Sequence, residues 1–350
     1  MTNQNAYHTA ASYRQLVTLN DQSEFAKVWQ QAFVQQPSVW EKIGLSETLD
    51  FFFELDDKRK IPLGSIGMQR LAPGIARLGI MGKMVAYFSL GARVMAGRKG
   101  TEEVTFYCLH NETHKQSFLA SIADRIVLSM LAPPLNWRRK IVVGKIRQEL
   151  LNAVKCGTSQ MTLLDIGCGG GFDGLELLLG VRRLRAALQG KHVVADLKII
   201  DVDIDTHWLG NNEILTAALV PDLAPDVVIR HNLSIFDYFV SKDAAQDIGQ
   251  PGKLVVSCNG FADFLPPEEM RKLLQYIQDA TRYIPQEVTI IVPMAVKNYV
   301  QAVSSRLVGF GYTTWETVTL RKLVEEIFVG YAISYEEQHS QGVFVLERRT

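Results

Sequence analysis

The residues best suited to chemistry in this 350-residue chain are one acid and three glycines within seven positions: Asp165, Gly167, Gly169 and Gly171. They follow the apolar run 161–164 and precede an expected helix over 172–188. Glycine tolerates positive φ and lets a ligand approach the backbone. The free N–H groups of the following helix face the same turn. A strand, a glycine loop and a helix in this order predict a nucleotide site.

The spacing of the glycines indicates which nucleotide to expect. The dinucleotide fingerprint G-x-G-x-x-G needs glycine at position 172, where this chain has Phe172. A nicotinamide oxidoreductase is therefore the least favoured alternative. Asp165 followed by G-x-G-x-G resembles the first motif of class I S-adenosylmethionine-dependent methyltransferases. The resemblance implies S-adenosyl-L-methionine as cofactor, and it places the following residues at it: Asp165, Gly167, Cys168, Gly169 and Gly171.

A second apolar run, 197–202, ends among acids. In the family that this chain resembles, an acid at the end of the second strand holds both ribose hydroxyls, which a carboxylate can do by accepting two hydrogen bonds. Asp203, with Ile204 beside it, matches that position. Asp201 is the alternative, because it lies one strand period earlier and faces the same side. The distance from Gly167 exceeds the ~20 residues of the dinucleotide pattern, so either acid remains open.

Two further strand ends carry polar residues. The run 226–231 leads to Asn232 and Leu233, and the resemblance places them against the adenine. The run 253–258 leads to Asn259 and Gly260, which match the cofactor-facing end of a fourth strand. A helix is expected from Pro266, with proline and acids in its first turn.

The remaining pattern predicts a fifth strand over 287–293, a helix over 295–307 and closing strands over 312–320 and 342–346. Strands that alternate with helices predict an α/β fold with a doubly wound, mostly parallel, seven-stranded Rossmann-like sheet. A helical N-terminal domain over 1–135 is expected to cap the substrate site or form a dimer. Residues 136–350 are expected to form the methyltransferase domain that binds the cofactor.

The N-terminal part shows helical patterning, including 116–131 and 137–154. The apolar segment 61–96 is interrupted by charged residues, so no uncharged run long enough for a transmembrane helix is present. Arg138, Arg139 and Lys140 are expected on a solvated helix face, with an acidic substrate group as the alternative partner. We also expect homodimer contacts through the N-terminal helices.

Composition narrows the class of protein. The chain carries 37 basic and 37 acidic residues, and this balance argues against a general nucleic-acid-binding surface. Its four cysteines include no C-x-x-C pair, so neither a disulfide framework nor a zinc site is expected. The polar N-terminus is unlike a signal peptide. We therefore expect a cytoplasmic enzyme without a metal.

Two candidates for a catalytic base stand apart in the sequence. Many small-molecule O-methyltransferases carry a His-Asp pair after the fourth strand, but this chain has Phe261, Ala262 and Asp263 there. Asp263 is the local candidate, with an acid at a helix start as its alternative. His110, in the cluster 107–114, is the second candidate, and its alternatives are a polar helix start or, with His114, a metal ligand.

The function that the sequence favours is methyl transfer to a small-molecule acceptor, apolar or amphipathic, with O-methylation ahead of N-methylation. The turn 257–261 lacks the (Asn/Asp)-Pro-Pro-aromatic motif of methyltransferases that act on amides and bases. A protein or RNA methyltransferase and a non-catalytic methyltransferase-like binding protein remain as alternatives.

Overall fold

A computed structural model gives the structure of part of the chain. The residues that it describes are 84, 87–89, 118–158, 160–187, 196–220, 222–223, 227–249, 252–282, 284, 287–297, 313–338 and 340–348. The predicted helical domain over 1–135 therefore lies mostly outside the described residues, as does His110. Within the described residues, no helix is long and apolar enough to cross a membrane.

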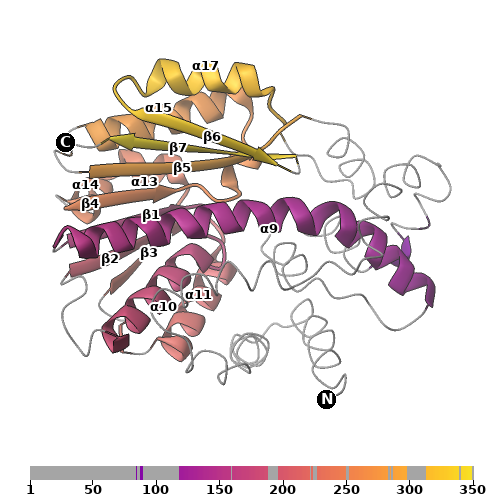
Figure 1. The fold of residues 1–350 in the computed structure, drawn as a ribbon, viewed down its shortest axis with the longest axis horizontal. Coiled ribbons are helices and arrows are strands. Elements are labelled where there is room, and N and C mark those ends of the chain that lie inside the picture. The colour runs from indigo at the N-terminus through magenta and orange to yellow at the C-terminus, as the bar shows by residue number, and fades with distance from the viewer. Residues whose placement is uncertain are drawn as a thin grey trace.

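The described residues build one seven-stranded sheet in the order β3-β2-β1-β4-β5-β7-β6 (Figure 1). Its strands are β1 (Gln160–Ile166), β2 (Asp196–Asp203), β3 (Val228–Asn232), β4 (Lys253–Ser257), β5 (Glu287–Ala295), β6 (Ala332–Gln338) and β7 (Gln341–Arg348). The five strands β1 to β5 pair in parallel, whereas β7 pairs antiparallel with both β5 and β6. The predicted doubly wound, mostly parallel sheet is confirmed.

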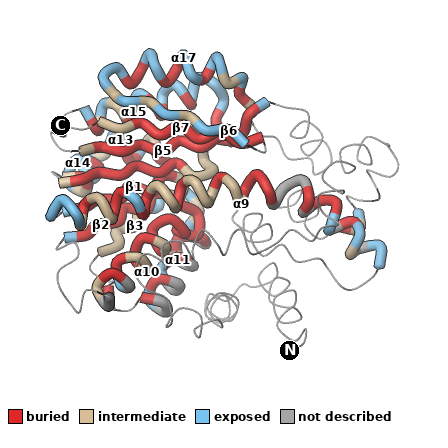
Figure 2. Tube along the Cα trace, in the orientation of Figure 1, coloured by how far each residue is buried: buried red, intermediate tan, exposed pale blue. Residues whose placement is uncertain are grey.

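Helices cover both faces of the sheet. They are α9 (Phe118–Lys155), α10 (Phe172–Ala187), α11 (Thr206–Leu219), α13 (Ile235–Val240), α14 (Lys242–Ile248), the 3₁₀ helix η1 (Phe261–Phe264), α15 (Pro267–Arg282) and α17 (Thr317–Ile327). One apolar cluster joins the sheet to α13, α14, α15 and α17, and a second joins it to α9 and α10. Figure 2 shows the strands buried between these layers.

Burial on both faces explains why the central strands read as continuous apolar runs. Every residue of β4 is buried, and β1 is buried after its first residue. The amphipathic helix α15 instead buries Met270, Leu273, Leu274 and Ile277, which recur with helical spacing. This spacing turns one stripe of α15 to the sheet and leaves its acids in solvent.

The strand order creates the place where a ligand belongs. The chain leaves β1 for β2 on one side and later returns to β4 on the other side, so the connections diverge at the carboxyl end of β1. In open α/β sheets such a switch point forms a crevice, because the loops on either side turn away from each other. The glycine loop predicted from the sequence follows β1 at this point.

The prediction of a closing strand over 312–320 is wrong. Among residues 313–320, which the structure describes, only Trp315 makes a bridge, with Val296, and the helix α17 begins at Thr317. Leu320, Leu323, Val324 and Ile327 recur with helical spacing and are buried. The prediction over 342–346 is confirmed as part of β7, and the strand that the sequence missed is β6. Its half-exposed, polar sequence lies at the sheet edge, where the apolar signal of a strand is weak.

Two helix predictions need correction. Residues 118–131 and 137–154 of the two predicted ranges belong to one continuous helix, α9, with Pro133 and Pro134 inside it. Proline removes a helical N–H donor, but both prolines are buried, and tertiary packing keeps the path helical. The helix α9 therefore runs across the predicted domain boundary at 135/136. The fifth strand extends to Ala295, so the helix predicted over 295–307 does not begin at Ala295, and residues 298–307 lie outside the described part of the chain.

Candidate functional site

The glycine loop after β1 has a backbone that only glycine adopts without strain. Gly167, Gly169 and Gly171 have φ of 62°, 52° and 65°, in the left-handed region. A Cβ on Gly167 would also lie 2.6 Å from Cβ of Phe261, whose 3₁₀ helix packs over the loop. Glycine therefore recurs at every second position of G-x-G-x-G because the backbone of the turn is left-handed at those positions.

The loop is fastened to the end of β2. Gly167 N–H donates to the Val202 carbonyl at 2.8 Å, and Gly169 N–H donates to Oδ2 of Asp203 at 2.8 Å. The other oxygen, Oδ1, accepts from Asp205 N–H at 2.9 Å. Burial raises the pKa of the Asp203 carboxyl, and these backbone donors oppose that shift. Asp203 thus joins the two strand ends that flank the crevice.

Asp201, the alternative acid, lies deeper. It is 1% exposed, and its Oδ2 accepts from Nδ2 of Asn212 at 2.7 Å. Burial raises its pKa to about 6, and the nearby Arg230 opposes the shift. Asp165 is its neighbour in the register of β1 and β2 and is also buried. Of the two acids, Asp203 alone bonds the glycine loop, whereas Asp201 bonds Asn212 of α11.

The turn after β2 is held by Asn232 from the end of β3. Its Nδ2 donates to the carbonyls of Asp203 at 3.2 Å and Ile204 at 2.9 Å. The Ile204 side chain is 70% exposed, and Leu233 packs partly buried against the core. An exposed apolar side chain beside an exposed amide forms a surface that suits a flat heterocycle.

The end of β4 contacts the first turn of α10 through Asp173, which the sequence prediction missed. Ser257 Oγ donates to Oδ2 of Asp173 at 2.7 Å, and Asn259 Nδ2 donates to its Oδ1 at 3.1 Å. Burial raises the pKa of Asp173. Oδ1 of Asn259 is buried without a hydrogen-bond partner. An acid in the first turn after the glycine loop was the available signal.

Cys168 and Gly260 complete the residues predicted for the cofactor. Cys168 is 6% exposed, which fits a small side chain that fills the loop. Gly260 has a φ of 97°, and a Cβ there would lie 3.1 Å from Nη2 of Arg138. The structure brings the residues predicted for the cofactor to the carboxyl ends of β1, β2, β3 and β4; their contacts with a cofactor stay a prediction.

Comparison with known proteins bears on the fold. No family model matches the chain, and no curated protein matches it. Solved structures do match the chain. A "possible exported protein" from Bordetella parapertussis is 13% identical with a TM-score of 0.52, over 84% of this chain and 98% of that one. A candidate methyltransferase from Thermobifida fusca is 17% identical (TM-score 0.44, 65% and 89% covered), and a SAM-dependent methyltransferase from Agrobacterium tumefaciens is 8% identical (0.39, 61% and 62%).

The chain has a doubly wound, Rossmann-like α/β fold with a mostly parallel seven-stranded sheet. The identities are too low to carry an activity or a substrate from these proteins.

Of the two predicted catalytic residues, Asp263 is described. It is 1% exposed; its Oδ2 lies 2.6 Å from Nη1 of Arg138, and its Oδ1 accepts from Ala295 N–H at 2.5 Å. Both oxygens are thus engaged. Burial raises its pKa, and the Arg138 guanidinium opposes that shift. This geometry favours a structural role that ties α9 to the ends of β4 and β5.

The expectation that Arg138, Arg139 and Lys140 form a solvated face is wrong for the first two. Arg138 is 7% exposed, and Arg139 pairs with Glu176 of α10 at 2.9 Å. A run of charges on a helix usually faces solvent, but the packing of α9 against α10 and β7 buries these side chains among carboxylates. In the described part of the chain, no cluster of three metal-ligating side chains occurs.

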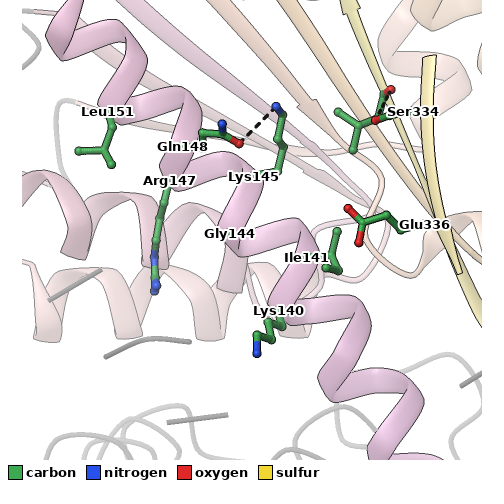
Figure 3. Close-up of a pocket in the computed structure, with 10 residues that line it drawn as sticks. Lys140, Ile141, Gly144, Lys145, Arg147, Gln148, Leu151, Ser334 and Glu336 are labelled. Carbon is green, nitrogen blue, oxygen red and sulfur yellow. Dashed lines mark hydrogen bonds between the residues drawn. The ribbon is translucent and has the colours of Figure 1, made fainter. Parts of the chain in front are cut away.

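A groove of about 450 Å³ lies elsewhere, between α9 and the strands β6 and β7 (Figure 3). Its lining includes Lys145 and Gln148 of α9 and Ser334 and Glu336 of β6, and no residue of the glycine loop. Lys145 already pairs with Glu149 at 3.0 Å. The groove is therefore separate from the crevice at the switch point.

Replacing Arg138 by methionine should destabilise the protein, because Asp263 would keep a buried charge without its partner. Breaking a buried ion pair in this way costs about 3–5 kcal/mol. Urea unfolding of Arg138→Met measures the loss. Arg271→Ala is the matched control, because Arg271 pairs with Glu326 at the surface. Equal effects from the two variants would contradict the structural role of the buried pair.

Replacing Gly171 by alanine should also destabilise the protein. The left-handed backbone alone opposes a side chain by about 1–2 kcal/mol, and the new Cβ would lie 1.6 Å from Nδ2 of Asn212. Gly180→Ala provides the control in α10, because its Cβ would meet Leu150 at an ordinary 3.4 Å. Thermal unfolding should separate the two variants, and an unperturbed Gly171→Ala protein would show that the loop adopts another conformation.

Proposed function

We propose that this protein is an S-adenosylmethionine-dependent methyltransferase that acts on a small-molecule acceptor. The observation that carries the proposal is the contact between Gly169 and Asp203. It joins a loop of left-handed glycines to an acid at the next strand end, where the sheet opens its crevice. This combination suits a nucleoside ligand with vicinal hydroxyls.

The donor and acceptor set fits that cofactor. Asp203 accepts backbone hydrogen bonds from Gly169 on Oδ2 and from Asp205 on Oδ1, and a carboxylate has about four acceptor sites, so it retains acceptor capacity for the ribose. Oδ1 of Asn259 is a buried acceptor without a partner, and it suits the ammonium of an amino-acid tail. Ile204 and Asn232 provide an apolar face and an amide for the adenine. When bound, S-adenosylmethionine supplies a methyl group activated on a positively charged sulfonium.

The same loop is unsuited to a dinucleotide. Phe172 occupies the position of the third glycine, which in dinucleotide sites allows close packing of helix and strand. The Phe172 ring is buried, and it would lie 3.1 Å from a Cβ on Gly170. An aromatic ring packed against the turn favours a cofactor without a pyrophosphate.

The chain's own part in the transfer is to orient the reactants, since a well-aligned acceptor and an activated methyl group need little more. An oxygen acceptor that ionises above neutral pH also needs a base. Asp263 has both oxygens engaged, and Nε2 of His231 bonds Asp247 at 2.6 Å. We therefore retain His110, which lies outside the described residues, as the proposed base for O-methylation.

Calorimetric titration of the purified protein with S-adenosylmethionine, S-adenosylhomocysteine and NADH tests the proposal. Micromolar binding of both sulfur nucleotides and none of NADH is the expected result. Binding of NADH alone would contradict it, and the absence of all binding would favour a non-catalytic protein with a methyltransferase-like fold.

Asp203→Ala should weaken S-adenosylhomocysteine binding by roughly 1–3 kcal/mol, because it removes the acceptors for the ribose hydroxyls. The control is Asp196→Ala. Asp196 is the first residue of β2, at the end of the strand away from Asp203, and it is exposed. Its replacement should therefore leave the affinity unchanged. Equal affinities for Asp203→Ala and wild type would remove Asp203 from the site.

A further inference from the structure

The glycine loop has a second contact, between Gly171 and Asn212 of α11. Asn212 of α11 is 1% exposed, and its side-chain amide lies directly against Gly171. A Cβ on Gly171 would come within 1.6 Å of Nδ2 and 2.6 Å of Cγ of Asn212. Gly171 is therefore a place where the amide of one helix touches the backbone of the loop.

Both ends of that amide are held. Nδ2 donates to Oδ2 of Asp201 at 2.7 Å. Oδ1 accepts from Arg230 of β3 twice, from Nη2 at 2.8 Å and from Nε at 3.1 Å. Nη2 of Arg230 also donates to Thr216 Oγ1 at 2.6 Å. The amide thus lies between a carboxylate and a guanidinium. Because the carboxylate needs a donor and the guanidinium needs an acceptor, the Asn212 amide can adopt one orientation there.

We propose that Asn212 is a positioning residue for the cofactor, because it fixes the glycine loop through its contact with Gly171. The inference rests on the proposed function of the loop. Gly167 and Gly169 tether the loop to β2, and Asn212 contacts the end of the loop at Gly171, so the backbone is held before a ligand arrives. A loop that is already ordered loses less entropy on binding, which raises affinity.

The positioning role of Asn212 can be tested by exchanging the side chains of Asp201 and Asn212, because one is a carboxylate and the other an amide of the same shape. Asp201 carries the carboxylate, and Asn212 carries the donor. In the double variant Asp201→Asn/Asn212→Asp the hydrogen bond reverses, and the new carboxylate at position 212 accepts from Arg230. The net charge and the shapes of both side chains are retained. Asn212→Asp alone instead sets two buried carboxylates against each other, an arrangement that disfavours ionisation of both.

Two measurements follow the loop and the ligand separately. Hydrogen–deuterium exchange of the peptide around 167–172 in ligand-free protein reports how firmly the loop is held. Calorimetry with S-adenosylhomocysteine reports affinity. At about pH 8, which favours ionisation of both facing carboxyls and so their repulsion, we expect Asn212→Asp to raise both the exchange rate and the Kd about tenfold, as loss of one charged hydrogen bond would. The double variant should return both to within about threefold of wild type.

Thr281→Val is the matched control, since Thr281 is a buried polar residue of α15, bonded to the Ile277 carbonyl on the other side of the sheet. It should lower the melting temperature without changing loop exchange or Kd. If Asn212→Asp does not fold, the double variant decides, because the reversed hydrogen bond predicts wild-type loop exchange.

Two results would overturn the positioning role. One is a folded Asn212→Asp variant whose loop hydrogen exchange and Kd are those of wild type. The other is fast hydrogen exchange of the loop in the folded double variant. The exchange measurement uses no ligand. A wild-type protein that binds neither sulfur nucleotide would therefore refute the proposed function, while the exchange rates would still decide whether Asn212 holds the loop.

Discussion

The hydrogen bond from Gly169 N–H to the Asp203 carboxylate is the contact on which the rest of the site depends. It requires β1 and β2 to be adjacent and parallel, so that both end at the same edge of the sheet. It also requires a left-handed turn after β1, which only glycine provides without strain. The order of the strands, the layers of helices and the spacing of the glycines all serve to bring this N–H and this carboxylate together.

Beneath this contact, the protein buries several carboxylates, each with a different partner. Asp173 is bonded by Ser257 and Asn259, Asp201 by Asn212, and Asp263 by Arg138. Burial raises the pKa of all three acids. Buried charges contribute little net stability even when paired. Their value here is geometric, because each one joins the carboxyl end of a strand, or the turn that follows it, to a neighbouring helix and limits how that region can rearrange.

The sequence predicted the parts of the fold that depend on local chemistry. The glycine loop, the apolar central strands and the amphipathic helix α15 follow from backbone freedom and periodicity. It did not predict β6, whose edge position leaves a polar, half-exposed pattern, or the continuity of α9 through Pro133 and Pro134. The roles of Arg138 and Asn212 were equally hidden, because their partners lie 125 and 11 residues away and meet them only in the folded sheet.

A crystal structure of the protein with S-adenosylhomocysteine would show whether the nucleoside binds beside the Gly169–Asp203 contact. We expect the nucleoside at the carboxyl ends of β1 and β2, with both ribose hydroxyls within hydrogen-bond distance of the Asp203 carboxylate and the adenine beside Ile204. Density for the ligand in the groove between α9 and β6, or ribose hydroxyls bound by a residue other than Asp203, would contradict this expectation.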